Sequence, residues 1–507
     1  MKGAVAGGSA PTVSGGEHAF RNGGNAVDAA IAATLMAGVA EPLLTGLGGS
    51  GMATIRFKGE TFNFDFFADM PGLSHPGAGP ASMEKVSINF GPTTQDFLVG
   101  PGSATVPGVP LGLWAMHERF GTVPMSVLAE PAIKAAKQGI QVTAGFERVV
   151  ELLWPILARS EALRGLFAPN GSPLKKGEVY RCPNLGRTLE RFAVAGPDYF
   201  RTGPGAQAFL AELGDQSLIS QRDFDRQSPR FTPALGADYR GSTLWIPGPP
   251  SAAGVGVAHT LAGLEAMGGP AEATGFETIR RLETALTATV DMRGKAFLRD
   301  LFTDGFGLAF MARVNAMRGG NPGSSAGYTT HISTVDEARN AVSITHSLGE
   351  TAGVVAGDSG VIVNNFLGEA DVNPPFLRRP PGSRLVTMCC PSILELADGR
   401  IVALGSGGSS RIPTAVVHGT MYMVDHAWSV EQAVRGPRTH IEGQRLHVES
   451  DGRSQDTMAA VAKHNPAVAR FDGPNMFFGG LHAASVGEDG FSGCGDARRS
   501  GAFGVVD

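Results

Sequence analysis

The chain has 507 residues, of which 42% are hydrophobic and 18% are charged, and its formal net charge at pH 7 is -5. This amount of apolar side chain is enough for one large core or two to three ordinary ones, which excludes an intrinsically disordered protein. The slightly acidic balance, with no run of Lys and Arg longer than a pair, excludes the basic surface that a nucleic acid partner requires.

The first half of the chain is predicted to be rich in helix. Residues 23–41 contain many alanines and carry Asp28 in the first turn, which predicts a helix that ends before Pro42. Apolar residues recur at helical spacing in three later stretches, 107–142, 146–192 and 278–301. Glycine and proline divide the first of these stretches into two helices.

Beyond residue 328 the pattern changes to short strands. The predicted strands occupy four stretches, 329–336, 340–348, 359–365 and 392–406. A turn at Asp398 and Gly399 makes the last stretch a hairpin. Helical patterns return at 414–424 and 430–434. This order predicts the α+β class, in which helices cover antiparallel sheet.

Cysteine content and hydropathy indicate the compartment. The chain has four cysteines, too few for a disulfide framework, and the neighbours Cys389 and Cys390 lack the CxxC spacing of a zinc site. Residues 1–16 contain no strongly apolar run of the kind that a secretory signal needs. The longest apolar stretch, 29–40, is about half the length of a membrane span. We therefore expect a cytoplasmic protein with no membrane partner.

Adjacent threonines, Thr329 and Thr330, begin the first predicted strand, which by pattern alone is an ordinary edge strand. The chain as a whole, however, resembles the γ-glutamyltransferase family in ordered blocks that run nearly from end to end. These blocks are GGNAVDAA (23–30), EPLLTGLGGSG (41–51), PGVPLGLWAMHERFGTVP (107–124), TTHISTVD (329–336), NAVSIT (340–345), SGVIVNN (359–365), GSGGSSR (405–411), FFGGLHAA (477–484) and DARRSGA (496–502). The resemblance implies the N-terminal-nucleophile hydrolase fold, a four-layer αββα sandwich of two antiparallel sheets covered by helices.

The resemblance also implies that a precursor cuts itself between Tyr328 and Thr329. The two resulting chains, a helix-rich large subunit 1–328 and a small subunit 329–507, are then expected to form a heterodimer, with a higher oligomer left open. A free α-amino group has a pKa of about 8, so it can accept the proton of the hydroxyl on the same residue. Thr329 is thus expected to be both nucleophile and base, with no separate catalytic histidine.

Three more residues receive catalytic roles from the resemblance. Ser347 falls where the family has a hydroxyl residue that hydrogen bonds to the nucleophile. Gly408 and Ser409 fall on paired glycines whose backbone N–H groups form the oxyanion hole, and such donors stabilise the tetrahedral intermediate by roughly 3 to 4 kcal/mol each. Ser409 departs from the second glycine but keeps the backbone N–H. The alternative for this segment is a plain turn after a strand.

The resemblance is weaker in substrate recognition. Phe67 stands where the family has the arginine that binds the substrate α-carboxylate, so no guanidinium is expected there. The family's two serines that bind the same carboxylate align with Thr387 and Met388, of which only Thr387 keeps a hydroxyl. The family's asparagine after the Ser347 position is replaced by Gly349.

On the amino-group side Asn365 is kept, Phe366 replaces a polar residue, and Glu369 stands in for the family's acid. An unpaired carboxylate in a buried pocket costs on the order of several kcal/mol. A pocket lined by Phe67, Phe366 and Met388 is therefore predicted to favour an acyl group less polar than γ-glutamyl. The alternative is that these three side chains only pack in the core.

Three functions stay open. The first is a hydrolase or transferase that takes a γ-glutamyl group from an amide such as glutathione through a threonyl acyl-enzyme. The second is an acylase or amidohydrolase of the same mechanism with another acyl group, similar to cephalosporin acylases. In both, the partner is a small amide or peptide substrate. The third is an uncleaved relative that serves as a binding or structural protein.

The remaining signals are weak. The glycines of 46–51 match GxGxxG, but they follow a helix and precede a strand, the reverse of the order in a dinucleotide site, so no cofactor is expected. The histidines show no ligand spacing, so no metal is expected, and His331 and His346 are predicted to pack or hydrogen bond within the sheet. Arg498 and Arg499 are either a solvated pair or part of a structural salt bridge.

Overall fold

The computed structural model describes residues 1–75, 77, 81–89, 94–314, 329–443 and 445–507. They form a mixed α/β protein built on two large antiparallel sheets. The first sheet has the order β20 (Ala502–Val506), β1 (Gly3–Gly7), β11 (Thr330–Asp336), β12 (Ala341–Ser347), β2 (Ser50–Phe57), β3 (Glu60–Phe66) and β8 (Arg230–Pro233). The second has the order β19 (Gly490–Cys494), β18 (Gly480–Gly487), β14 (Ile401–Gly407), β13 (Ser392–Glu395), β10 (Ser242–Ile246) and β9 (Leu235–Tyr239).

The two sheets face each other across a core of small side chains. Ala4 and Val335 of the first sheet and Ala403 and Ala484 of the second belong to one buried cluster. His331 of β11 lies against Gly405 of β14, where any Cβ would clash with the imidazole ring. The glycine therefore sets how closely the sheets approach beside the start of β11.

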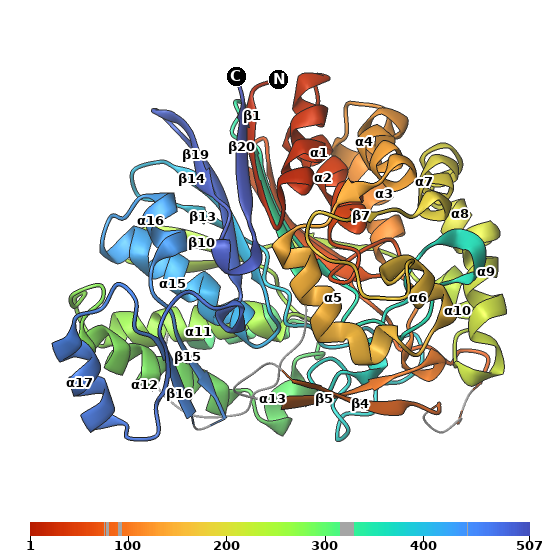
Figure 1. Cartoon of the computed structure of the whole chain (residues 1–507). Coiled ribbons are helices and arrows are strands. Elements are labelled where there is room, and N and C mark those ends of the chain that lie inside the picture. The colour runs from red at the N-terminus through yellow and green to blue at the C-terminus, as the bar shows by residue number, and fades with distance from the viewer. Residues whose placement is uncertain (76, 78–80, 90–93, 315–328, 444) are drawn as a thin grey trace.

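Helices cover the outer faces of both sheets (Figure 1). Those on the side of the first sheet are α1 (Ala10–Arg21), α2 (Ala26–Ala40), α3 (Val109–Phe120), α4 (Met125–Gln138), α5 (Ala144–Leu157), α6 (Glu161–Phe167), α7 (Pro183–Ala195), α8 (Asp198–Arg201), α9 (Pro204–Leu213) and α10 (Gln221–Arg226). Those on the side of the second are α11 (Ala252–Ala266), α12 (Phe276–Met292), α13 (Lys295–Asp300), α14 (Phe306–Val314), α15 (Arg411–Asp425), α16 (Val430–Arg435) and α17 (Gln455–His464). Within the described ranges, every helix is too short or too polar to span a bilayer.

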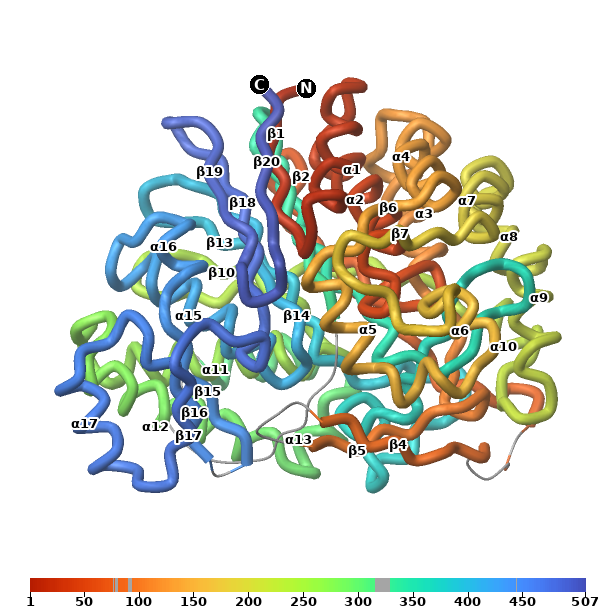
Figure 2. Tube along the Cα trace, in the orientation of Figure 1, coloured from red at the N-terminus to blue at the C-terminus, as the bar shows by residue number. Residues whose placement is uncertain are grey.

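Small sheets complete the fold. They pair β4 (Glu84–Asn89) with β5 (Thr94–Val99), β6 (Ile140–Gln141) with β7 (Val179–Tyr180), and β15 (Thr439–Glu442) with β16 (Arg445–Glu449) and β17 (Ala469–Phe471). The two ends of the chain lie side by side, because β20 pairs with β1 (Figure 2). A strand from each end of the chain thus closes one edge of the first sheet.

The helix predicted at 23–41 is confirmed as α2. Asn25 caps it, with its side chain accepting the N–H of Asp28 while the Asp28 carboxylate accepts the N–H of Asn25. Gly15 and Gly16 of α1 let that helix approach α2, because a Cβ at either position would crowd the α2 backbone. The alanine-rich sequence therefore serves close packing of α2 between α1 and the first sheet.

Most other predicted elements are confirmed within a few residues, but the strand at 359–365 is wrong. Apart from the isolated bridge between Val355 and Ile362, this segment pairs with no sheet among the described residues. Gly360 takes a left-handed conformation with φ of 70°. The side chain of Asn364 donates to the carbonyls of Gly48 and Thr105. The apolar run is therefore buried as a loop that bonds through its backbone to residues 352–356 and through the Asn364 side chain to two other loops.

Candidate active site

Thr329 immediately precedes β11 and is only 5% exposed. The β11–β12 register pairs Thr330 with His346, so the next position along the ladder sets Thr329 opposite Ser347. Ser347 ends β12, pairs with Ser50 of β2, and accepts the N–H of Gly349 at 2.8 Å through its hydroxyl. The hydroxyl residue predicted to orient the nucleophile therefore lies across the ladder from it. Tyr328, on the other side of the predicted cut, lies outside the described residues.

The turn after β14 lies against the backbone of Thr329. A Cβ at Gly407 would clash with the Thr329 carbonyl, so only glycine allows this approach. Gly408 follows with φ of 118° and Ser409 with φ of 46°. A serine in this left-handed region costs roughly 1 to 2 kcal/mol in backbone strain. The structure thus places both predicted oxyanion-hole residues in a tight turn beside the predicted nucleophile.

Two acids lie beyond this turn. The hydroxyl of Ser409 donates to Asp371, which the sequence analysis did not single out. Glu369 lies with Asn365 around Gly349, where a Cβ would clash with both side chains. Asn365 Oδ1 accepts the N–H of Glu350 at 2.8 Å. Gly349, the residue in place of the family's asparagine, therefore leaves room for an acid and an amide side by side.

Burial controls the charge of these acids. It raises the pKa of Glu369 well above its usual value, and the neighbouring carboxyl groups of Glu350 and Asp371 raise it further. Burial also raises the pKa of Asp371, against the opposing effect of the Ser409 hydroxyl. In the described part of the chain, Glu369 Oε1 and Asp371 Oδ1 have no hydrogen-bond partner. Buried acceptors without a donor are uncommon in folded proteins and indicate a place for a ligand donor.

A guanidinium interacts electrostatically with Asp371. Arg293, just after α12, donates from Nη2 to the sulfur of Met388 at 3.0 Å, and its buried Nε has no partner among the described residues. Burial lowers the pKa of Arg293, while the charge of Asp371 opposes that shift. A thioether is a weak acceptor, so this guanidinium retains hydrogen-bonding capacity. Sequence gave no signal for Arg293, which lies 95 residues from Met388 along the chain.

The structure does not bring the three predicted apolar pocket residues together. Phe67 and Phe366 are 2% and 1% exposed, and their ring centroids lie 5.0 Å apart in one buried cluster. Met388 belongs to a different cluster, beside Arg293. The Thr387 hydroxyl accepts the N–H of Cys389 at 3.1 Å within its own turn. Phe67 and Phe366 thus pack against each other in the core, whereas Met388 accepts a hydrogen bond from the guanidinium of Arg293.

On its other side, the start of β11 contacts a buried carboxylate. The hydroxyl of Thr330 donates to Glu41 at 2.6 Å, and Ser9 and Thr12 donate to the same carboxylate. Arg499 Nη1 donates to the carbonyl of Thr329 at 3.4 Å. These bonds fix the backbone at the predicted nucleophile and at the residue after it.

The neighbouring charged and aromatic groups are structural. Of the two alternatives for the C-terminal arginines, Arg498 forms buried salt bridges with Glu449 and Asp496. His331 hydrogen bonds within the sheet, and His346 bonds to Thr45 of a neighbouring loop. Burial lowers the pKa of His346 to about 3, so it stays neutral at ordinary pH.

Comparisons with known proteins agree with this geometry. A family model described as Gamma-glutamyltranspeptidase matches residues 13–506. The chain is 28% identical over 493 residues to an Acylase ACY 1 proenzyme of Pseudomonas sp. (strain V22), covering 92% of this chain and 87% of that one. It is also 28% identical over 532 residues to the Glutathione hydrolase proenzyme of Escherichia coli (strain K12), covering 96% and 89%.

A solved structure shares the fold. The cephalosporin acylase from Bacillus halodurans superposes with a TM-score of 0.81 over 99% of this chain and 95% of that chain, at 20% identity. The two sheets and their helical covers are thus an arrangement already seen in a solved protein.

Proposed function

Because the chain belongs to the gamma-glutamyltranspeptidase family, we propose that it is a self-processing threonine hydrolase and acyltransferase that acts on γ-glutamyl amides such as glutathione. The observation that carries this proposal is the position of Thr329, at the head of β11, opposite Ser347 and against the Gly407–Ser409 turn. We also propose the four-layer αββα arrangement, which the helices outside both facing sheets support.

The proposed reaction begins with cleavage before Thr329, which frees its α-amino group. The hydroxyl oxygen then attacks the substrate carbonyl and its proton passes to that amine. Backbone N–H groups of Gly408 and Ser409 hold the oxyanion. When the C–N bond breaks, the proton moves to the leaving amine and an ester to Thr329 remains. Water or a second amine then cleaves the ester and returns the proton to the threonine oxygen.

The unused hydrogen-bonding atoms of the site support a γ-glutamyl acyl group. Such a group carries an ammonium and a carboxylate on one carbon. Within the described ranges, Glu369 and Asp371 offer buried acceptors without a partner for the ammonium, and Arg293 offers an unpaired Nε for the carboxylate. We propose that Arg293 supplies from α12 the cation that Phe67 cannot supply.

The second candidate is an acylase of the same mechanism. The replacement of two polar groups of the family by Phe67 and Phe366, whose ring centroids lie 5.0 Å apart, favours it because it removes charged and polar partners of a γ-glutamyl group. A curated acylase also matches this chain at the same 28% identity as the glutathione hydrolase. The two candidates differ in the acyl group and share every catalytic step.

Replacement of the proposed nucleophile tests the function. Purified wild-type protein is expected to show two chains by intact mass, of 328 residues and of 507 − 328 = 179 residues. Thr329→Ala is expected to remain one chain and to hydrolyse no γ-glutamyl anilide, because nucleophile and base are both lost. Thr330→Ser, which keeps the hydroxyl that donates to Glu41, is the matched control and should be processed.

Substrate preference then separates the two candidates. A kcat/KM for γ-glutamyl anilide above that for glutaryl and simple acyl anilides supports the γ-glutamyl hydrolase, and the reverse order supports the acylase. Processing and turnover that survive in Thr329→Ala would contradict both.

A further inference from the structure

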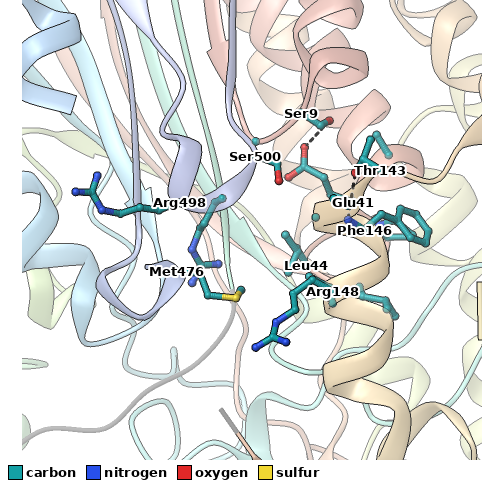
Figure 3. A pocket seen from close by; sticks show the side chains of 17 residues that line it. Ser9, Glu41, Leu44, Thr143, Phe146, Arg148, Met476, Arg498 and Ser500 are labelled. Carbon is teal, nitrogen blue, oxygen red and sulfur yellow. Dashed lines mark hydrogen bonds between the residues drawn. The ribbon is translucent and has the colours of Figure 1, made fainter. Parts of the chain in front are cut away.

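A cavity of about 270 Å³ lies between the end of α2, the start of α5 and the short helix Ala497–Arg499 (Figure 3). Among the described residues that line it, none has a catalytic or acyl-binding role in the proposed reaction. Its apolar wall consists of Leu44, Phe146, Val149 and Met476. Exposed residues at its rim open it to solvent, namely Thr143, Ala144 and Ser500. The cavity is therefore a binding space apart from the active site, slightly below the usual size of small-molecule pockets.

The charge of the cavity is positive. Arg148 of α5 and Arg499 both line it, and Glu41 is the only acid among the described lining residues. The Glu41 carboxylate already accepts hydrogen bonds from three hydroxyl groups, and burial raises its pKa. Arg498 points away from the cavity, toward its buried salt bridges (Figure 3). An anionic ligand therefore meets more positive than negative charge in this space.

Neighbouring acids on α5 do not neutralise Arg148, which donates no hydrogen bond to the described part of the chain. Glu151 pairs with Lys175 at 2.5 Å, and Glu147 pairs with the same lysine at 3.4 Å. Lys175 is the main cause that lowers the pKa of Glu151, and the charge of Arg148 contributes less to that shift. The Arg148 guanidinium is therefore available to an anion that enters the cavity.

Two residues of the lining also hold the backbone at the predicted nucleophile. Arg499 donates from Nη1 to the carbonyl of Thr329 at 3.4 Å. Glu41 accepts the hydroxyl of Thr330 at 2.6 Å. A ligand in the cavity can thus act on the position of Thr329 through residues that it contacts.

Both predicted chains contribute walls to the cavity. Segments 40–44 and 143–149 belong to the chain 1–328, whereas Met476 and residues 498–500 belong to the chain 329–507. A ligand bound here contacts both chains at once, close to the new end that the predicted cut creates.

We propose that this cavity is a regulatory site for a small amphipathic carboxylate, whose charged end pairs with Arg148 while its hydrocarbon part packs on the apolar wall. A carboxylate is a stronger acceptor for a guanidinium than a backbone carbonyl is, because its hydrogen bonds are charge-assisted. The bound anion therefore competes with the Thr329 carbonyl for Arg499. Binding at this site is independent of the proposed function, whereas its effect on turnover rests on that function.

The expected effect on turnover is a lower kcat with an unchanged KM for the donor. The KM stays the same because the ligand leaves Glu369, Asp371 and Arg293 open to the acyl group. Weakening one hydrogen bond to the backbone of the nucleophile is expected to lower kcat roughly two- to five-fold at saturating ligand.

The test uses 3-phenylpropionate as the probe and 3-phenylpropanamide as its neutral counterpart. Calorimetry with wild type is expected to show binding of the carboxylate and weaker binding of the amide. In Arg148→Gln, the Kd of the carboxylate should rise roughly five- to ten-fold, for one charged hydrogen bond at a partly exposed site, and the Kd of the amide should not change. Arg191→Gln, at an exposed arginine on α7 outside the cavity, is the matched control and should bind both probes as wild type does.

A second variant tests the space itself. Ala144→Trp places a large side chain at the exposed rim and is expected to weaken binding of both probes alike. Kinetics with γ-glutamyl anilide as donor then measure kcat and KM with and without the carboxylate.

Three results would overturn the inference. They are a lack of carboxylate binding to wild type, an equal Kd in Arg148→Gln, and competition between the carboxylate and the donor, which would place the probe in the acyl site. Binding that leaves kcat unchanged would contradict the regulatory role. If wild type hydrolyses no donor, the proposed function fails, and calorimetry with the same variants still decides whether the cavity binds the carboxylate.

Discussion

Under the proposed function, the choice of acyl group depends on Arg293. Its Nη2 lies on the sulfur of Met388 and its Nε is buried without a partner in the described chain. Arg293→Met is expected to lower kcat/KM for γ-glutamyl anilide about 30-fold, since a charge-assisted hydrogen bond contributes roughly 2 kcal/mol. The 4-aminobutyryl anilide, which lacks the α-carboxylate, should lose no more than about two-fold, because nothing on it needs the guanidinium.

Arg299→Met, on the exposed surface of the neighbouring α13, is the control for this comparison. An equal loss for both anilides would mean that Arg293 supports the fold of the site and does not read the carboxylate. The sequence could not predict that Arg293 belongs to the candidate site, because Arg293 and Met388 come from distant segments that only packing brings together.

At the scale of elements, the packing of β11 against β14 depends on one close contact, between His331 and Gly405. The ring of His331 occupies the space where a side chain of Gly405 would lie, between the two facing sheets. Gly405→Ala is expected to lower the free energy of unfolding by about 2 to 3 kcal/mol, because neither strand can move without separating the sheets. Urea unfolding in the uncleaved Thr329→Ala background measures this in a single chain.

Gly165→Ala in α6 is the opposite control. Gly165 is exposed and has open space where a Cβ would lie, so alanine is expected to raise stability by about 0.5 to 1 kcal/mol through helix propensity. Equal effects of the two substitutions would contradict the role given to the contact between the sheets.

At the scale of the whole molecule, the predicted cut divides both large sheets. Strands β1, β2, β3 and β8 come before residue 329, whereas β11, β12 and β20 come after it, and all seven form one sheet. The cleaved chains are therefore expected to stay together and to elute as one species in size exclusion with light scattering, separating only under denaturing conditions. The segment 329–507 expressed alone should be insoluble, since its strands lack their neighbours.

A soluble, folded 329–507 fragment would contradict this dependence. The oligomeric state of the heterodimer and the cytoplasmic location stay predictions, which the same elution profile and cell fractionation can check.

Sequence by itself determined the order and type of most elements, the family, and the positions of Thr329, Ser347 and the turn at Gly408 and Ser409. These features are local in the chain. Helical and strand periodicity, glycine positions and contiguous blocks of matching sequence can be recognised without knowing which distant residues are in contact. Only the tertiary structure decided that 359–365 is a loop and that Phe67 and Phe366 pack in the core. It alone placed Arg293 and Asp371 beside the site and opened the cationic cavity at Arg148, because burial, partner choice and unpaired charge are set by segments far apart in sequence.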